Sequence, residues 1–380
     1  MKGRLGLQLA APVLAVGFAL LVSALILLKA GYSPLDVLDV IVSDGFKRER
    51  IADTLNRAGP YYISGVAVAV GFKMNLFNIG VEGQYKVAAL FAAWAGASVT
   101  LPAAIHVPFI LLVAMVVGGL WSAIAGILRA TRGVSEVIST IMLNSISFGL
   151  SSYLLNRYFA APRGEFAETV GTVRIAKSGR LPSLNGPLEL IGIHLPGSVR
   201  IQSFILVAAL VGVAYYVLLF RTRFGFDLRA SGSNAEAAEA SGVNPRRMVV
   251  QAMIVSGAIA GLVGLNNVMG EAGRYTDVSV VRGLGFTGIA VALLGRNHPV
   301  GIAAGALLWS FMDALQVPLS NNELPKQITA ILQGVTVMSV VIAYEIVRRV
   351  GLRRDAAVLR RDGHEAAPPH AGPAAEVAPA

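Results

Sequence analysis

Polar side chains interrupt an apolar part of this 380-residue chain. The segment 71–84 reads GFKMNLFNIGVEGQ, and a further asparagine lies inside a later apolar stretch. Amides and carboxylates bind solutes by hydrogen bonding, and a helix break at membrane depth is tolerated where its backbone is buried or lines a water-filled cavity. The alternative is a tight turn built on glycines and capped by asparagines. The candidates for lining a solute pathway are Asn75, Phe77, Asn78, Glu82, Gln84 and Asn144.

A second polar segment, 221–248, joins two long apolar stretches and reads RTRFGFDLRASGSNAEAAEASGVNPRRM. Its Ser-x-x-Glu spacing is that of a capping box and predicts one short helix over 234–241, closed by a left-handed glycine and followed by a proline. Isolated helices shorter than ~12 residues are marginal in water, so we expect a partner surface. The alternative is a plain connection between spans. The residues assigned to this docking helix, 233–242, are Ser233, Asn234, Glu236, Ala238, Ala240 and Gly242.

The chain lacks the sequence signatures of common enzymes. It contains no GxxxxGK[ST] phosphate loop, no HExxH motif and no cysteine, and its five histidines are scattered. We therefore expect no enzymatic activity, no metal and no cofactor, and energy for any transport must come from a partner or an ion gradient. The net charge of +10 comes from arginines that flank apolar stretches, without a dense basic face, so nucleic-acid binding is not expected.

Composition predicts an all-α, polytopic integral membrane protein. Hydrophobic residues make up 55% of the chain and charged residues 14%, and the mean hydropathy is +0.65. Stretches of about 20 apolar residues cross a bilayer. Two of the ten predicted spans, 60–72 and 284–296, are short and carry glycines, so we expect broken or re-entrant helices there. The predicted spans are 7–28, 60–72, 84–100, 108–128, 136–156, 200–220, 248–268, 284–296, 300–317 and 327–347.

The distribution of arginines orients these spans. Lys2 and Arg4 precede the first span, and arginine-rich loops recur at the side that the positive-inside rule makes cytoplasmic. Both termini are then cytoplasmic, the loop 221–247 faces the cytoplasm, and the loop 157–199 is extracytoplasmic. A permease domain over 1–349 is followed by an arginine-rich and then Ala/Pro-rich tail, 350–380, whose composition predicts disorder.

Other polar residues within spans have two interpretations. A carboxylate such as Asp313 is expensive inside a membrane and suggests ion coupling, but a structural hydrogen bond is the favoured interpretation. The asparagines at 266 and 267 are expected to bond between helices. The small-residue pairs Gly257–Gly261 and Gly301–Gly305 predict close helix packing.

Three stretches of the sequence resemble the membrane-spanning permease subunit of ABC-type importers. The resemblance is to the nucleoside and simple-sugar branch, related to branched-chain amino-acid permeases, and is closer to nucleoside members. The stretches are NLFNIGVEGQ at 75–84, RGVSEVISTIMLN at 132–144 and GSNAEAAEASGVNPRRMVVQAMIVSGAIAGLVG at 232–264.

This resemblance implies a location, partners and a mechanism. The chain would lie in the bacterial cytoplasmic (inner) membrane and translocate nucleosides or simple sugars. A separate ATPase subunit would dock on the coupling helix 233–242, a related second permease would form a heterodimer with this chain, and an extracytoplasmic substrate-binding protein would deliver the solute. The alternatives are an ion-coupled secondary transporter of a small polar solute, with Glu82 or Asp313 carrying a proton, and a non-transporting membrane scaffold.

Overall fold

The computed structural model describes residues 17–162, 169–190, 192, 199–270 and 272–365. Within these ranges the chain is predominantly helical and forms no β-strand, only isolated bridges. It divides into two compact units, residues 27–333 and a smaller unit made of 1–26 and 334–380. The functional features described below all lie in the larger unit.

The helices follow the hydrophobic segments of the sequence. Short helical turns η1 (Leu155–Phe159) and η2 (Lys177–Gly179) lie between α6 and α8, and an apolar helix Gly17–Lys29 precedes α2. The α-helices are α2 Pro34–Asp44, α3 Arg48–Lys73, α4 Val81–Ser98, α5 Ala103–Arg132, α6 Glu136–Leu154, α7 Asn185–Leu190, α8 Phe204–Arg221, α9 Arg223–Ser233, α10 Ala235–Ala240, α11 Pro245–Gly261, α12 Leu265–Val268, α13 Leu284–Leu294, α14 Pro299–Ala314, α15 Gln316–Asn321 and α16 Gln327–Glu365.

Six helical segments in the described part are long and apolar enough to cross a membrane, which makes this a multi-pass membrane protein. They are Ala103–Arg132, Glu136–Phe159, Phe204–Arg221, Pro245–Val268, Pro299–Asn321 and Gln327–Val347. The remaining predicted spans correspond to helices that are shorter, such as α13, or more polar, such as α3 and α4.

Two predictions about helix boundaries are wrong. The segment 60–72 is not a broken helix but the second half of α3, which continues for 26 residues through Pro60. Proline removes one helical hydrogen bond, yet almost the whole of 58–71 is buried, and tertiary packing stabilises a helix more than local propensity does. At the other end of the chain, α16 continues to Glu365, into the predicted disordered tail, because alanine, leucine and arginine over 351–361 favour helix. Residues 366–380 lie outside the described part.

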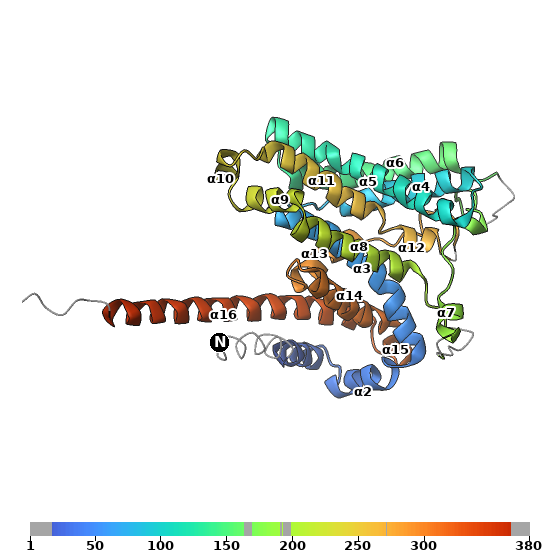
Figure 1. Ribbon diagram of the computed structural model, residues 1–380. Coiled ribbons are helices and arrows are strands. Elements are labelled where there is room, and N and C mark those ends of the chain that lie inside the picture. The colour runs from blue at the N-terminus through green and yellow to red at the C-terminus, as the bar shows by residue number, and fades with distance from the viewer. Residues whose placement is uncertain (1–16, 163–168, 191, 193–198, 271, 366–380) are drawn as a thin grey trace, which may run out of the picture. The chain divides into compact units, whose positions relative to one another are not determined.

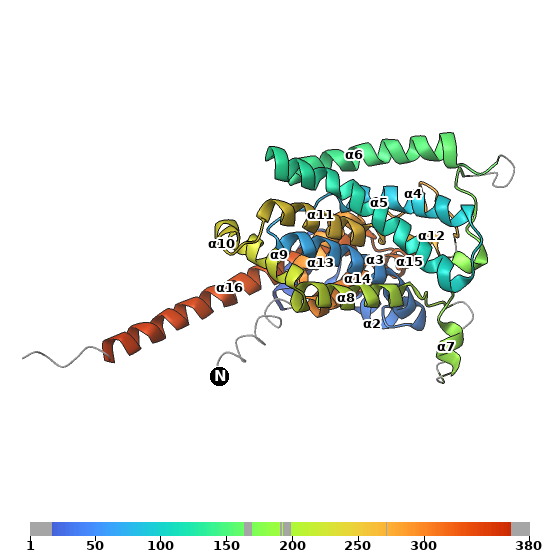
Figure 2. The ribbon, with the colours of Figure 1, turned by 45° about the horizontal axis from the view of Figure 1, so that its top comes forward.

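Helix α3 lies at the centre of the larger unit. It packs against α8, α11, α13 and α14, while α4, α5, α6 and α11 lie side by side on one flank (Figures 1 and 2). Helices α9 and α10 lie at one end of this bundle, and α7 and α12 lie at the other (Figure 1). The buried core runs from Tyr61 to Ala306 and is rich in alanine and valine, so that the helices approach closely.

Small residues bring α5 and α11 into backbone contact. A Cβ atom on Gly257 would lie 2.5 Å from the Gly118 carbonyl oxygen, and one on Gly261 would lie 2.1 Å from the Ala114 carbonyl oxygen. Any side chain at these positions would separate the helices. The packing role expected for Gly257 and Gly261 is therefore confirmed.

Candidate functional site

Most residues predicted to border a pathway lie in or beside the turn 74–80, which joins α3 to α4 and is called the polar turn below. Asn75 is exposed and has a left-handed backbone, with φ of 57°. Phe77 is 47% exposed, and its ring packs edge-on against the ring of Phe72, with 4.8 Å between the two ring centroids. The other candidates are buried, namely Asn78, Glu82, Gln84 and Asn144.

Asn78 is the centre of a buried hydrogen-bond network at the polar turn. Its amide nitrogen donates to Gln84 Oε1 at 3.0 Å and to Ser256 Oγ in α11 at 2.8 Å. Its Oδ1 accepts from the Gly80 N–H at 3.0 Å and from Gln84 Nε2 at 2.9 Å. Ser256 in turn donates to the Ala67 carbonyl in α3 at 2.6 Å. Asn78 uses its full hydrogen-bonding capacity to join α3, α4 and α11.

The motif at the start of α6 binds the same turn. Asn144 Oδ1 accepts the Gly83 N–H at 2.8 Å, and Asn144 Nδ2 donates to the Ile79 carbonyl at 2.9 Å. Glu136 Oε1 accepts the Phe77 N–H at 3.3 Å. These side chains satisfy backbone groups that the chain leaves free between α3 and α4. The three family-like motifs, far apart in sequence, therefore meet at one place.

Glu82 caps the first turn of α13. Its side chain is 3% exposed, and its two oxygens accept the N–H groups of Gly283 at 2.7 Å and Gly285 at 2.9 Å. A carboxylate at this position satisfies two of the N–H groups that a helix start leaves free and faces the positive end of the helix dipole. Ser64 in α3 donates to the Leu284 carbonyl at 2.7 Å. Glu82 and Ser64 together fix where this short helix begins.

A buried cation holds the segment between α12 and α13 on α4. Lys86 is 4% exposed, and its Nζ lies 3.4 Å from Asp277 Oδ1 and 4.5 Å from the centre of the Phe148 ring. Tyr275 donates its hydroxyl to the same Asp277 oxygen at 3.3 Å. Burial and this carboxylate raise the pKa of Tyr275 above its ordinary value.

The segment 221–248 contains two helices, α9 and α10, where the sequence predicts one. The chain leaves helical geometry at Asn234, and Asn234 Oδ1 accepts the Ala237 N–H at 3.0 Å. Ser233 instead ends α9, so the predicted capping box of Ser233 with Glu236 is wrong by one residue. Asparagine caps a helix as well as serine does, which is why the spacing alone did not decide between them.

The C-terminal end of α10 is as expected. Gly242 has φ of 86°; its N–H donates to the Glu239 carbonyl at 2.9 Å, and the Val243 N–H donates to the Ala238 carbonyl at 3.0 Å. These two bonds form a Schellman motif. Ala238 is 3% exposed and faces the protein, so it is not available to a partner. The exposed residues of α10 are Ala235, Glu236, Ala237, Glu239 and Ala240.

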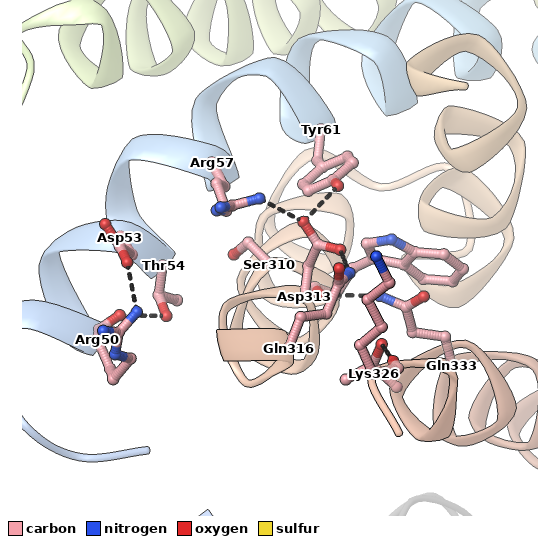
Figure 3. A network of polar contacts seen from close by, with 12 residues as sticks. Arg50, Asp53, Thr54, Arg57, Tyr61, Ser310, Asp313, Gln316, Lys326 and Gln333 are labelled. Atoms are coloured by element: carbon pink, nitrogen blue, oxygen red, sulfur yellow. Dashed lines mark hydrogen bonds and ion pairs between the residues drawn. The ribbon is translucent and has the colours of Figure 1, made fainter. Parts of the chain in front are cut away.

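Asp313 in α14 is the centre of a second polar network (Figure 3). Its Oδ2 accepts from Arg57 Nη1 at 2.8 Å and from the Tyr61 hydroxyl at 3.1 Å, and the Gln316 amide donates to its Oδ1. The side chain of Asp313 is 14% exposed. One cation and two further donors surround this carboxylate, which is the geometry of a structural network between α3 and α14.

A cavity of about 290 Å³ lies beside this network and is bordered by residues of α12. Residues three and four apart share one face of a helix, and one such face of α3 forms a wall. That wall consists of Asp53, Asn56, Arg57, Pro60 and Tyr61. The opposite wall comes from the segment before α8, the α11–α12 connection, α12 itself and the segment that leads into α13, and includes Gln202, Gly264, Asn266, Asn267, Val281 and Leu284.

A broken helix does line this cavity, but it is not the one predicted at 71–84. Helix α11 ends at Gly261 and α12 begins at Leu265, so residues 262–264 form an interruption on the cavity wall. Across the cavity, Pro60 has no N–H to donate to the Asn56 carbonyl. Interrupted backbone of this kind is found in membrane proteins where it borders a cavity.

The sequence interpretation misses the α3 face because it starts the second predicted span at residue 60, which leaves out the first part of α3. A signal is present: Asp53, Asn56, Arg57 and Tyr61 repeat at helical spacing directly before the apolar run. Asn266 and its neighbour were identified as polar span residues but assigned to interhelical bonding. Among the described residues, no group of three His, Asp or Glu side chains is placed to hold a metal ion.

Comparisons with known proteins are consistent with the sequence motifs. Residues 50–341 match the family model described as the branched-chain amino acid transport system / permease component. The guanosine ABC transporter permease protein NupP of Bacillus subtilis is 34% identical, covering 89% of this chain and 94% of its own length. The glucose ABC transporter permease protein TsgB13 of Haloferax volcanii is 32% identical, covering 90% of each chain. The guanosine ABC transporter permease protein NupQ of B. subtilis is 26% identical, covering 70% of this chain and 80% of its own length.

Proposed function

The chain belongs to the family of branched-chain amino acid transport system permease components, and we propose that it is the membrane-spanning subunit of an ATP-driven importer of nucleosides. The observation that carries this proposal is similarity to a guanosine permease over nearly the whole length of both chains. The glucose permease is almost as similar, so a simple sugar is the second candidate. The amide-lined cavity suits either solute, since amides donate and accept hydrogen bonds.

Uptake tests the proposal directly. Deletion of the gene in a strain without another nucleoside system should abolish uptake of radiolabelled guanosine, and excess unlabelled ribose should not compete in the parent strain. Unchanged guanosine uptake with lost glucose uptake would move the assignment to the sugar candidate. Unchanged uptake of both solutes would overturn the proposal.

An ion-coupled mechanism has less support. Both oxygens of Glu82 accept backbone N–H groups, and Asp313 is paired with Arg57 and two further donors. Both carboxylates are therefore engaged in bonds within the protein. A protonophore should therefore leave the initial rate of uptake unchanged while ATP is present, and immediate loss of uptake would favour the secondary transporter.

We assign ATPase docking to the exposed face of α10. This helix has six residues, too few to be stable in water by itself, and Ala238 fixes it to the protein by its buried side. Its exposed face carries small residues and two glutamates. Gly232 in α9 contacts the end of α3 so closely that a Cβ would lie 2.5 Å from the Lys73 carbonyl oxygen. Movement of α9 and α10 would thus be transmitted to α3 and the polar turn.

A pair of arginine substitutions tests this docking. Ala237→Arg places a large cation on the exposed face of α10 and should abolish both co-purification of the ATPase subunit and uptake. Thr131→Arg makes the same change at an exposed position at the end of α5 and should leave both unchanged. Normal ATPase association in Ala237→Arg would show that α10 is not the docking site.

The wider assembly follows from the same family relation. We propose a heterodimer with a related permease, because this chain is similar to two different permeases of the guanosine transporter of one organism. An extracytoplasmic binding protein would supply the solute to this pair. We further propose ten spans in the bacterial inner membrane with both termini cytoplasmic. Because the chain has no native cysteine, single introduced cysteines can be labelled from each side of the membrane to test this topology.

A further inference from the structure

We infer that the cavity between α3 and α12 is a binding site for an uncharged solute that carries several hydroxyl or N–H donors. Assigning it to the transported solute rests on the transport function proposed above. The polar turn, where the sequence motifs meet, has its side chains committed to the protein. The cavity is different, because part of its hydrogen-bonding capacity is unused.

Two cavity side chains have no partner for their carbonyl oxygens. Gln202 Oε1 and Asn266 Oδ1 are buried and accept no hydrogen bond from any part of the chain that the structure describes. A buried acceptor without a partner destabilises the folded protein. Both side chains line the cavity, so a turn of either amide towards a bound hydroxyl or N–H group would give its oxygen the partner it lacks, which favours a ligand rich in donors.

Two further amides hold the cavity wall in place. Asn56 Oδ1 accepts the Gln202 N–H at 2.8 Å, and Asn56 Nδ2 donates to the Arg200 carbonyl at 2.8 Å. Asn267 Nδ2 donates to the Ser279 carbonyl at 2.7 Å. Asn56 and Asn267 therefore act as positioning residues. They leave Gln202 and the adjacent Asn266 free to contact the ligand.

The charges at the cavity favour a neutral ligand. Arg57 is paired with Asp313 at 2.8 Å, and Asp53 is paired with Arg50 at 2.8 Å. A phosphate group at Arg57 would compete with Asp313 for the same guanidinium and weaken this ion pair. The site is therefore expected to accept a nucleoside or a sugar and to reject the corresponding phosphate ester.

The size of the cavity agrees with such a ligand. Its volume of about 290 Å³ lies at the lower end of the ~300–1,000 Å³ typical of small-molecule sites. Tyr61 is the aromatic side chain in the lining, and its hydroxyl donates to Asp313. The interrupted α11–α12 backbone at Gly264 adds a peptide group to the same wall.

Cysteine labelling can test the site independently of transport, because the chain has no native cysteine. Val281→Cys places a thiol at the cavity mouth, where the native side chain is 49% exposed. Val278→Cys is the matched control, since it lies in the same segment, is 82% exposed and does not line the cavity. Both variants would be labelled with a small polar thiol reagent in membrane vesicles containing the full transporter, with guanosine, glucose or guanosine monophosphate as the added probe.

Protection should be confined to the cavity position. At a guanosine concentration about ten times the dissociation constant, roughly nine-tenths of the sites are occupied, so labelling of Val281→Cys should slow about tenfold. Labelling of Val278→Cys should not change, and guanosine monophosphate should protect neither variant. Protection by glucose in place of guanosine would support the same site with a sugar ligand. No protection by either neutral solute, or equal protection by the phosphate ester, would overturn the inference.

Transport kinetics give a second readout. Asn266→Ala should raise KM for the transported solute about tenfold, the equivalent of one or two lost hydrogen bonds. Asn321→Ala, at an exposed position at the end of α15, should leave KM unchanged. Equal KM values in both variants would overturn the binding role of Asn266. Protection of Val281→Cys in a transporter that takes up neither solute would instead leave the site standing and remove the proposed function.

Discussion

Replacing Glu82 by glutamine should loosen the start of α13 without unfolding the bundle. The carboxylate is 3% exposed and accepts two backbone N–H groups, at 2.7 Å from Gly283 and 2.9 Å from Gly285. Glutamine has nearly the same shape but offers one acceptor oxygen. Its NH₂ group would face the second N–H, so one donor of the first turn of α13 would lose its partner in a buried place.

The magnitude follows from these two contacts. A hydrogen bond to a charged group contributes ~1.5–3 kcal/mol, and a negative charge at a helix N-terminus contributes up to ~2 kcal/mol in a partly buried setting. Loss of one bond and of the charge should therefore cost about 3 kcal/mol locally. Since 1.4 kcal/mol corresponds to a factor of ten, hydrogen-exchange protection of the first turn of α13 should fall about 100-fold.

Hydrogen exchange read by mass spectrometry on the purified chain in lipid nanodiscs would measure this change. Peptides covering 282–290 report on α13, and peptides from α5 report on the remainder of the bundle. Glu239→Gln is the matched control, because it makes the same chemical change on the exposed face of α10. Wild-type protection of α13 in Glu82→Gln, or an equal loss of protection in α5, would refute the local capping role.

Two further substitutions test the packing and the ion pair. Gly232→Ala would place a Cβ 2.5 Å from the Lys73 carbonyl oxygen and should destabilise the chain by ~1–3 kcal/mol in a thermal unfolding scan. In the control Gly149→Ala the new Cβ meets no atom within 4 Å, so this change should be neutral or slightly stabilising in the same scan. Asp313→Asn should lower stability by only ~0.5–1 kcal/mol at low salt, because solvent screens an ion pair whose partner Arg57 is half-exposed. The stability difference from the wild type should shrink at high salt, and a difference that does not depend on salt would contradict the ion-pair explanation.

Local signals in the sequence predicted several elements well. Helices α5, α6 and α8 begin and end within a few residues of the apolar stretches, because burial of a long apolar segment outweighs every local alternative. Gly242 closes α10 as predicted, since a left-handed position after a short helix favours glycine. Whether a helix forms and where it ends depend mainly on residues close together in the sequence, so both can be predicted from the sequence.

The cavity could not be predicted from the sequence in the same way. Pro60 suggested a helix boundary, but packing on several neighbouring helices carries α3 through it, and this packing is not visible in the residues around Pro60. The wall opposite α3 combines Gln202 with Asn266, which only the complete fold brings together. By contrast, polar residues are frequent in 71–84 because the backbone of this turn needs many hydrogen-bond partners. A role in the pathway for Asn75 and Phe77 stays a prediction.

The polar turn also sets an order of events during synthesis of the chain. Asn78 leaves the ribosome long before Asn144, which bonds to Ile79 and Gly83 in the same turn, and before its own partner Ser256, which lies 178 residues further on. Until α6 and then α11 are made, the hairpin of α3 and α4 carries buried amide and backbone groups that lipid cannot satisfy. We therefore expect the nascent hairpin to stay at the protein-conducting channel, or beside an insertion chaperone, until the later helices arrive. Ribosome-bound intermediates truncated before and after residue 256 should differ sharply in how readily the hairpin crosslinks to that machinery.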